Sequence, residues 1–271
     1  MPNLNIRPFD PSTMKPTATV LLLGARGTGK STLLNDIMYH VHRNFNFGIA
    51  MSPTEESTES LSAIMPRSCV FDDFAEDAVG RMLRYQKKMV KLGGRNMFII
   101  MDDCAYDTRT LKGKNIREVF MNGRHRKIFI INAVQYMMDV PSFLRGQVDY
   151  VFAMRDNIID QREKLWKFFF GMFSDYKDFS AVMDQCTQDH NCLVLDKTVR
   201  SNNVEDTVFW YCANPDLPSF RLCDDVFWKM DEQYYESDTG GSDDEVGVGG
   251  GGGGGGGVNA KVPLVVTRAA H

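Results

Sequence analysis

The sequence lacks the features that mark membrane-spanning and secreted proteins. No apolar run approaches the roughly 18 residues that a membrane-spanning helix needs. The first residues, MPNLNIRPFDPSTMKP, do not have the charged-then-apolar order of a signal peptide. The six cysteines show no paired C-x-x-C spacing, and several lie in apolar runs where cysteine behaves as a small buried side chain. We therefore expect a protein of a reducing compartment, without stable membrane insertion.

A zinc site is only weakly indicated. Cys186, His190 and Cys192 lie close together in the sequence, but their spacing is irregular for a set of zinc ligands. This pattern favours a structural role for the three residues and leaves metal binding open.

A surplus of positive charge is also missing. The 31 lysines and arginines are outnumbered by 35 acids, so the net charge is −4. Residues 236–271 hold five of the acids and two of the bases, which leaves a nearly neutral body. This balance argues against a binder that relies on bulk positive charge, but it leaves open a channel lined locally by lysine and arginine.

One boundary is visible near the end of the chain. The acidic segment ESDTGGSDDEVGV leads into an unbroken glycine run. Such a segment buries too little apolar surface to offset its ordering entropy. We expect one folded domain over residues 1–235 and a flexible acidic, glycine-rich tail over residues 236–271.

Short apolar runs alternate with segments of helical period through most of the body. The runs that we predict to be strands are TATVLLLG, FNFGIAMS, SCVFDD, NMFIIMDDC, KIFIINAVQ and VDYVFAMR. Helices are predicted after the first run, over residues 75–92, and in the aromatic stretch LWKFFFGMF. The later runs CLVLDKT and DTVFWYCA are expected to pair as a hairpin on the flank of the sheet. The predicted fold is therefore α/β, a mostly parallel central sheet flanked by helices, with a late β-hairpin.

A phosphate-binding loop follows the first predicted strand. The sequence matches the pattern G-x-x-x-x-G-K-[ST] between a strand and an apolar-striped helix, which is the context that this motif requires. Lys30 is placed to reach the β- and γ-phosphates, and the Ser31 hydroxyl to bind Mg²⁺. The predicted nucleotide-binding residues are Gly24, Ala25, Arg26, Gly27, Thr28, Gly29, Lys30, Ser31 and Thr32.

Two adjacent acids end the apolar run FIIM. We predict that Asp102 binds Mg²⁺ and that Asp103 polarises the attacking water as a general base. Paired acids after a strand can also cap a helix, but their coupling to a phosphate loop favours the catalytic interpretation. A second acid also favours an ATPase over a kinase, because a kinase must exclude an activated water.

Three further residues are candidates for catalysis. Gln135 follows the fourth long apolar run and is our choice for a group that touches the attacking water or the γ-phosphate, with Asn132 second. Arg124 and Arg145 precede predicted strands, and either could supply the cation that a ring-forming NTPase takes from a neighbouring subunit. Capping and surface roles remain open for all of them.

These motifs resemble the DNA-packaging ATPases of large nucleocytoplasmic DNA viruses, of the poxvirus and algal-virus type, within the FtsK-HerA branch of P-loop NTPases. The resemblance covers about residues 16–213 and is carried by LLLGARGTGKST, FIIMDDC, NGRHRKIFIINAVQ, LVLDKT and VFWYCA. It implies hydrolysis of ATP with Mg²⁺ in a homo-oligomeric ring, a pentamer or hexamer, that drives viral double-stranded DNA into a capsid.

The resemblance also implies partners and a location. A capsid or vertex protein would anchor the ring, at virus assembly sites in the host cytoplasm or in the virion. A cellular DNA translocase or helicase of the same branch is the nearest alternative. A small-molecule kinase is disfavoured because the stretch after Arg155 is poor in arginine, and a GTPase because the chain has no N-K-x-D motif.

Overall fold

The fold is built on a single nine-stranded sheet. The computed structural model describes residues 4–104 and 110–239. The strand order is β1-β9-β8-β7-β2-β6-β5-β3-β4. The strands are β1 (Arg7–Pro8), β2 (Thr19–Leu23), β3 (Phe45–Met51), β4 (Val70–Phe71), β5 (Asn96–Asp102), β6 (Ile128–Val134), β7 (Tyr150–Ala153), β8 (Asn191–Asp196) and β9 (Val208–Cys212).

The sheet is mostly parallel, as the sequence predicts. All pairs from β7 through β2, β6, β5 and β3 to β4 are parallel, and only β8 runs antiparallel to its neighbours β7 and β9. Strands β2 and β6 are buried along their whole length because helices cover both faces. The parallel strands therefore end at one common edge, which we call the carboxyl edge; the opposite one is the amino edge.

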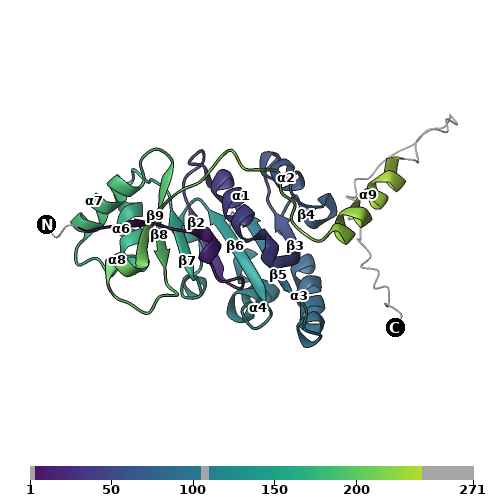
Figure 1. Cartoon of the computed structure of the whole chain (residues 1–271). Coiled ribbons are helices and arrows are strands. Elements are labelled where there is room, and N and C mark those ends of the chain that lie inside the picture. The colour runs from purple at the N-terminus through teal and green to yellow at the C-terminus, as the bar shows by residue number, and fades with distance from the viewer. Residues whose placement is uncertain (1–3, 105–109, 240–271) are drawn as a thin grey trace, which may run out of the picture.

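Two helical layers enclose the sheet (Figure 1). On one face, Leu33 of α1 and Leu61 of α2 pack with Val20 and Leu22 of β2. On the other face, α3, α4, α6 and α7 pack against the alternate strand residues, represented by Leu21 and Leu23. The helices are α1 (Lys30–Val41), α2 (Glu55–Ser62), α3 (Glu76–Lys91), α4 (Lys114–Asn122), α5 (Ser142–Arg145), α6 (Ile159–Phe168), α7 (Tyr176–Cys186), α8 (Val204–Thr207) and α9 (Asp225–Thr239).

The aromatic stretch differs from the prediction. The helix α6 ends at Phe168, so only the first part of LWKFFFGMF is helical. Beyond its end, Phe170 and Phe173 pack on Phe179 of α7, with ring centroids 5.2 and 5.7 Å apart. An apolar run of this density has no polar face, so it fills the core after the helix has ended rather than extending an amphipathic helix.

The flanks of the sheet confirm one prediction and add two elements. The hairpin of β8 and β9 forms as predicted, with the short helix α8 in its connection. The two-residue strand β1 adds to the outer edge of β9. Helix α9 continues to Thr239, past the expected domain boundary at Glu236, and the rest of the predicted tail lies outside the described residues. No helix in the described part of the chain is long and apolar enough to cross a membrane.

Candidate functional site

The phosphate loop connects β2 to α1 at the carboxyl edge. Gly27 and Gly29 adopt positive φ angles of 78° and 95°, a region that other residues enter only with strain. This backbone lets the chain turn directly into α1, whose first turn carries the exposed hydroxyl residues Ser31 and Thr32. A helix start of this kind presents backbone N–H groups and partial positive charge to an anion.

Lys30 lies at the centre of the site. Its side chain is 7% exposed, and its Nζ donates a hydrogen bond to the Gly24 carbonyl at 2.9 Å. The same nitrogen lies 3.7 Å from Oδ2 of Asp103. The structure thus brings the loop lysine together with Asp103, the acid that directly follows β5, although the two lie 73 positions apart in the chain.

Asp102 is held so that one of its oxygens stays unpaired. The Ser57 hydroxyl, on α2, donates to Oδ2 at 2.7 Å, whereas Oδ1 has no hydrogen-bond partner among the described residues. Burial raises the pKa of this carboxyl group above its ordinary value, and the nearby Asp103 carboxylate adds to the effect. A buried acid with a free oxygen favours binding of a cation.

Asp103 has a strained backbone. Its φ angle is 52°, in the left-handed region, and its N–H donates to the Ala133 carbonyl of β6 at 3.0 Å. This turn places the carboxylate against Gln135, whose Nε2 donates to Oδ2 at 3.0 Å. Strained residues of this kind cluster at functional sites. The Oδ1 atom has no partner within the described ranges.

The oxygen atoms at the site suit Mg²⁺, which takes one or two carboxylates together with hydroxyl, water and phosphate oxygens. Asp102 offers its unpaired Oδ1, and Ser31 offers an exposed hydroxyl at the start of α1. In residues 4–104 and 110–239, no group of three His, Cys, Asp or Glu side chains is arranged to hold a metal ion. Cys186, His190 and Cys192 therefore form no such group.

Asn132 is buried between the phosphate-loop strand and the strand of Asp102. It is 1% exposed on β6, paired in register with Leu21 of β2 and Met101 of β5. Neither polar atom of its amide has a hydrogen-bond partner in the described structure. A buried unpaired amide is costly, by about 1–3 kcal/mol, so its position between the phosphate-loop strand and the strand of Asp102 supports a functional role.

The two predicted arginines, Arg124 and Arg145, lie at the amino edge, away from the phosphate loop of the same chain. Arg124 precedes β6 and forms an ion pair with Asp149, which precedes β7. Arg145 ends α5, donates to the Val140 carbonyl at 2.9 Å, and lies over the Phe168 ring at 4.4 Å. Each has a partner within the subunit, and neither reaches Lys30 or Asp103.

Sequence reasoning missed two residues of the carboxyl edge. Ser57 contacts Asp102 from α2, and no motif in the sequence singles it out. Arg155 is exposed immediately after Met154, whose Sδ lies 3.0 Å from the Thr28 hydroxyl of the phosphate loop. The signal that could have found Arg155 is its place just after a predicted strand, since that is where catalytic groups of parallel sheets gather.

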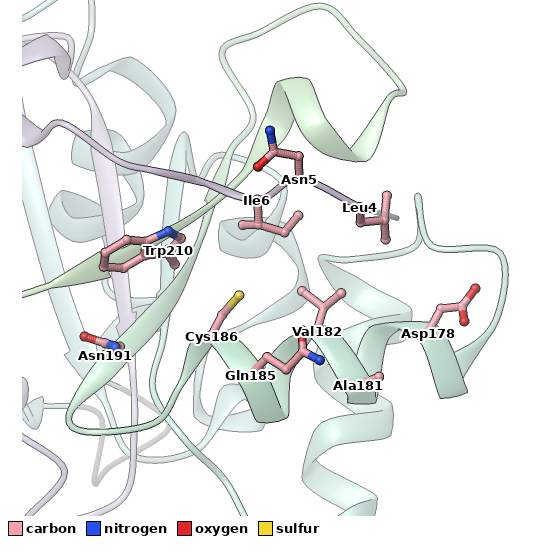
Figure 2. A pocket seen from close by; sticks show the side chains of 10 residues that line it. All are labelled: Leu4, Asn5, Ile6, Asp178, Ala181, Val182, Gln185, Cys186, Asn191 and Trp210. Carbon is pink, nitrogen blue, oxygen red and sulfur yellow. The ribbon is translucent and has the colours of Figure 1, made fainter. Parts of the chain in front are cut away.

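A separate cavity of about 530 Å³ lies at the other flank of the molecule. Figure 2 shows that it is enclosed by the N-terminal segment at Ile6, by α7 at Val182 and Cys186, and by Trp210 of β9. No residue of the phosphate loop lines it, and its one charged lining side chain is Asp178. The cavity is therefore not part of the nucleotide site.

Sequence relatives occur in large DNA viruses. The uncharacterised protein 088R of Invertebrate iridescent virus 3 is 29% identical over 222 residues, which cover 78% of this chain and 85% of the relative. An uncharacterised protein of Acanthamoeba polyphaga mimivirus is 28% identical over 86% of this chain and 84% of its own length. No protein-family model matches the chain.

Among solved structures, the genome-packaging NTPase B204 of Sulfolobus turreted icosahedral virus 2, in complex with AMPPCP, has a TM-score of 0.55. It is 17% identical, and the match covers 74% of this chain and all of B204. ATPases 2 and 3 of EssC from Geobacillus thermodenitrificans match at a TM-score of 0.50 and 8% identity, over 82% of this chain and 43% of EssC.

These matches agree with the resemblance that the motifs indicate. The solved structures share the fold of this chain, and the sequence relatives come from large DNA viruses. The chain therefore has the P-loop ATPase fold of the viral genome-packaging NTPases.

Proposed function

We propose that the protein hydrolyses ATP with Mg²⁺ at the carboxyl edge. The observation that carries this proposal is the convergence of Lys30 and Gln135 on one oxygen of Asp103. Three strands that are separate in sequence, β2, β5 and β6, bring these side chains together. A structural ion pair would not need a backbone strained at Asp103 or an unpaired Asp102 oxygen beside it.

Each side chain then has a distinct role. Lys30 and the N–H groups of the loop bind the phosphates, and Asp102 and Ser31 hold Mg²⁺, which supplies neutralisation of phosphate charge when bound. Gln135 fixes Asp103 through Oδ2, so that Oδ1 is free to accept a proton from water. Asn132 can report the change in charge through its unpaired amide.

We further propose that hydrolysis drives viral double-stranded DNA into a capsid. The support is the likeness to B204, a genome-packaging NTPase, and the sequence relatives in large DNA viruses. By the same analogy the protein acts as a pentameric or hexameric ring, bound to a capsid or vertex protein, at assembly sites in the host cytoplasm or in the virion.

A ring allows a neighbouring subunit to supply an arginine to the transition state, an effect of about 10³ to 10⁵ in rate. Arg155 joins Arg124 and Arg145 as a candidate because it is exposed at the edge where the phosphate loop lies. The alanine variant of the arginine that acts in trans would bind ATP but hydrolyse it slowly. Mixing that variant with Lys30→Ala subunits would restore some turnover, since a mixed interface pairs an intact loop with an intact arginine.

The deciding experiment is an ATPase assay of the full chain with and without double-stranded DNA, coupled to native mass measurement with ATP and Mg²⁺. The proposal expects Mg²⁺-dependent turnover that DNA stimulates and a mass of five or six subunits. ATP turnover by a monomer, at a rate that DNA does not change, would point to another kind of P-loop enzyme.

A further inference from the structure

The charge of the chain is strongly uneven. Residues 81–127 contain 13 lysines and arginines against four acids, a net charge of +9 in a chain whose total is −4. This stretch includes most of α3 and all of α4, which contact each other on the face of the sheet opposite α1 and α2 (Figure 1). The nearly neutral body therefore contains one strongly basic region, residues 81–127.

Helix α3 gathers its bases on one side. Its buried residues, such as Val79, Met82 and Gln86, lie on the side that faces the sheet. At 100° per residue, Arg84 and Lys88 fall on the opposite side. We define the α3 stripe as the basic residues within about 120° of arc on that outer side: Arg81, Arg84, Lys87, Lys88 and Lys91. All but the half-buried Arg81 are exposed.

The α3 stripe is not the usual salt-bridged surface of a helix. On α6, Lys164 pairs with Asp160 at 2.5 Å and Lys167 with Glu163 at 3.5 Å. On α3, Arg84 has Lys88 at the i+4 position, a like-charge pair that destabilises a helix. No residue of the α3 stripe forms an ion pair with another described residue.

The favourable field at a helix C-terminus accounts for Lys88 and Lys91 in the last turn of α3, but not for Arg84 in its middle.

The start of helix α4 carries two lysines at a position where positive charge is unfavourable. Lys112 precedes its start and Lys114 is its first residue, both exposed, and the first turn contains no acid. Cations at a helix N-terminus are opposed by the helix dipole. The two exposed lysines therefore add positive charge at this end of α4, next to the Glu76 carboxylate that accepts from the Asn115 N–H.

The two helices form one braced platform. The Glu76 carboxylate, at the start of α3, accepts a hydrogen bond from the Asn115 N–H in the first turn of α4 at 2.8 Å. The Asn115 side chain donates to the Glu76 carbonyl at 3.3 Å. These contacts fix the bases of both helices relative to each other, and such preorganisation favours binding of a regular array of charges.

We propose that the α3 stripe and the start of α4 form the surface that binds the phosphate backbone of double-stranded DNA, independently of sequence. The proposal rests on the proposed motor function for its choice of DNA. The α3 stripe spans about 15 Å at 1.5 Å per residue, a length over which a duplex presents roughly nine phosphates. In the sequence, α4 begins 11 residues after Asp103, the base of the proposed site.

The test compares two double variants of the full chain. Arg84→Gln with Lys88→Gln removes two unpaired charges from α3, and the matched control, Lys164→Gln with Lys167→Gln, removes two paired charges from α6. Binding to a 30-base-pair duplex is measured by fluorescence anisotropy from 50 to 300 mM salt. Melting temperature and ATP turnover without DNA verify that each variant is folded.

The α3 variant should bind DNA about 10- to 100-fold more weakly at 0.1 M salt, with a salt slope shallower by about 2. The control should change affinity less than about twofold, and both should keep basal turnover. Lys112→Gln with Lys114→Gln should repeat the loss, which keeps the proposal testable if the α3 variant fails to fold.

Equal affinities for the α3 variant and the control would overturn the proposed surface while leaving the ATPase intact. Tighter binding of the wild type to duplex RNA than to duplex DNA would overturn the choice of partner. Wild type that binds DNA through the α3 stripe but never hydrolyses ATP would instead refute the proposed function and leave the surface standing.

Discussion

Asp149 at the amino edge of the central sheet and the paired acids at its carboxyl edge differ in how fully their oxygens are hydrogen-bonded. At the amino edge, the buried Asp149 is satisfied: its Oδ2 accepts from the Thr19 N–H at 2.9 Å, and its Oδ1 pairs with Arg124. At the carboxyl edge, Asp102 and Asp103 each keep one oxygen, Oδ1, without a partner in the described part of the chain. Satisfied polar groups stabilise a fold, whereas unsatisfied ones are kept where a ligand will use them. We therefore expect mutations at the carboxyl edge to lower activity and the mutation of Asp149 at the amino edge to lower stability.

The largest effect should come from the carboxyl edge, with Lys30→Ala. Removing the amino group deletes the phosphate contact, and losing one preorganised charge of this kind lowers the rate about 10²- to 10³-fold. Steady-state turnover of ATP measures the loss, and thermal melting should show a fold at least as stable as the wild type's. Unchanged turnover would show that Lys30 is not at the active site.

The paired acids should divide binding from hydrolysis. Asp103→Asn should keep ATP-Mg²⁺ binding but lose turnover by about 10²-fold or more, because the amide cannot accept the proton from water. Asp102→Asn should weaken Mg²⁺-dependent nucleotide binding, because it removes a carboxylate from the cation. Titration with a fluorescent ATP analogue, with and without Mg²⁺, distinguishes them. Normal turnover in Asp103→Asn would place the base elsewhere.

At the amino edge, Asp149→Ala should affect stability instead. The change leaves the Thr19 N–H and Arg124 without their carboxylate partner, and an unsatisfied buried donor costs about 1–3 kcal/mol. For a chain of this size each kcal/mol lowers the melting temperature by about 2–4 °C. Calorimetry measures the shift, and turnover below the melting range should be normal. Lost ATP turnover with an unchanged melting temperature would contradict the stabilising role of Asp149.

The smallest effect should follow removal of residues 240–271. Acidic and glycine-rich sequence contributes little buried apolar area, so melting temperature and ATP turnover should stay within error of the full chain. The truncation retains α9, which ends at Thr239. A drop of several degrees in melting would reveal that this segment packs on the body.

The sequence predicts the carboxyl edge better than the rest of the molecule, for a physical reason. A phosphate loop and a pair of acids must follow strands, so Lys30, Asp102 and Asp103 can be located from local pattern alone. Ser57 reaches the same edge from α2, and no local pattern encodes that contact. Arg155 follows a predicted strand, so its place at this edge could have been predicted in the same way as that of the acids.

The amino edge and the basic surface show the limits of local and averaged signals. Arg124 lies before a strand, which made it a candidate trans-acting arginine, but its ion pair with Asp149 depends on β6 and β7 flanking β2. The total charge of −4 gives no hint of the α3 stripe, because an average over the chain cancels bases on one face against acids elsewhere. The aromatic stretch LWKFFFGMF is predicted to be helical, but α6 ends at Phe168. Its pattern lacks a polar face, so it gives no sign of where the helix ends.

The left-handed backbone at Asp103 restricts how this protein can change over evolutionary time. Asparagine and aspartate enter that conformation more readily than other side chains, and glycine enters it freely. A longer acid such as glutamate would keep the negative charge, but it would displace the carboxylate from Gln135 and Lys30 and lose the backbone preference. The residues that fit this backbone best besides aspartate, namely asparagine and glycine, cannot act as a general base. A substitution to either one would therefore keep the fold and the proposed nucleotide site but abolish hydrolysis.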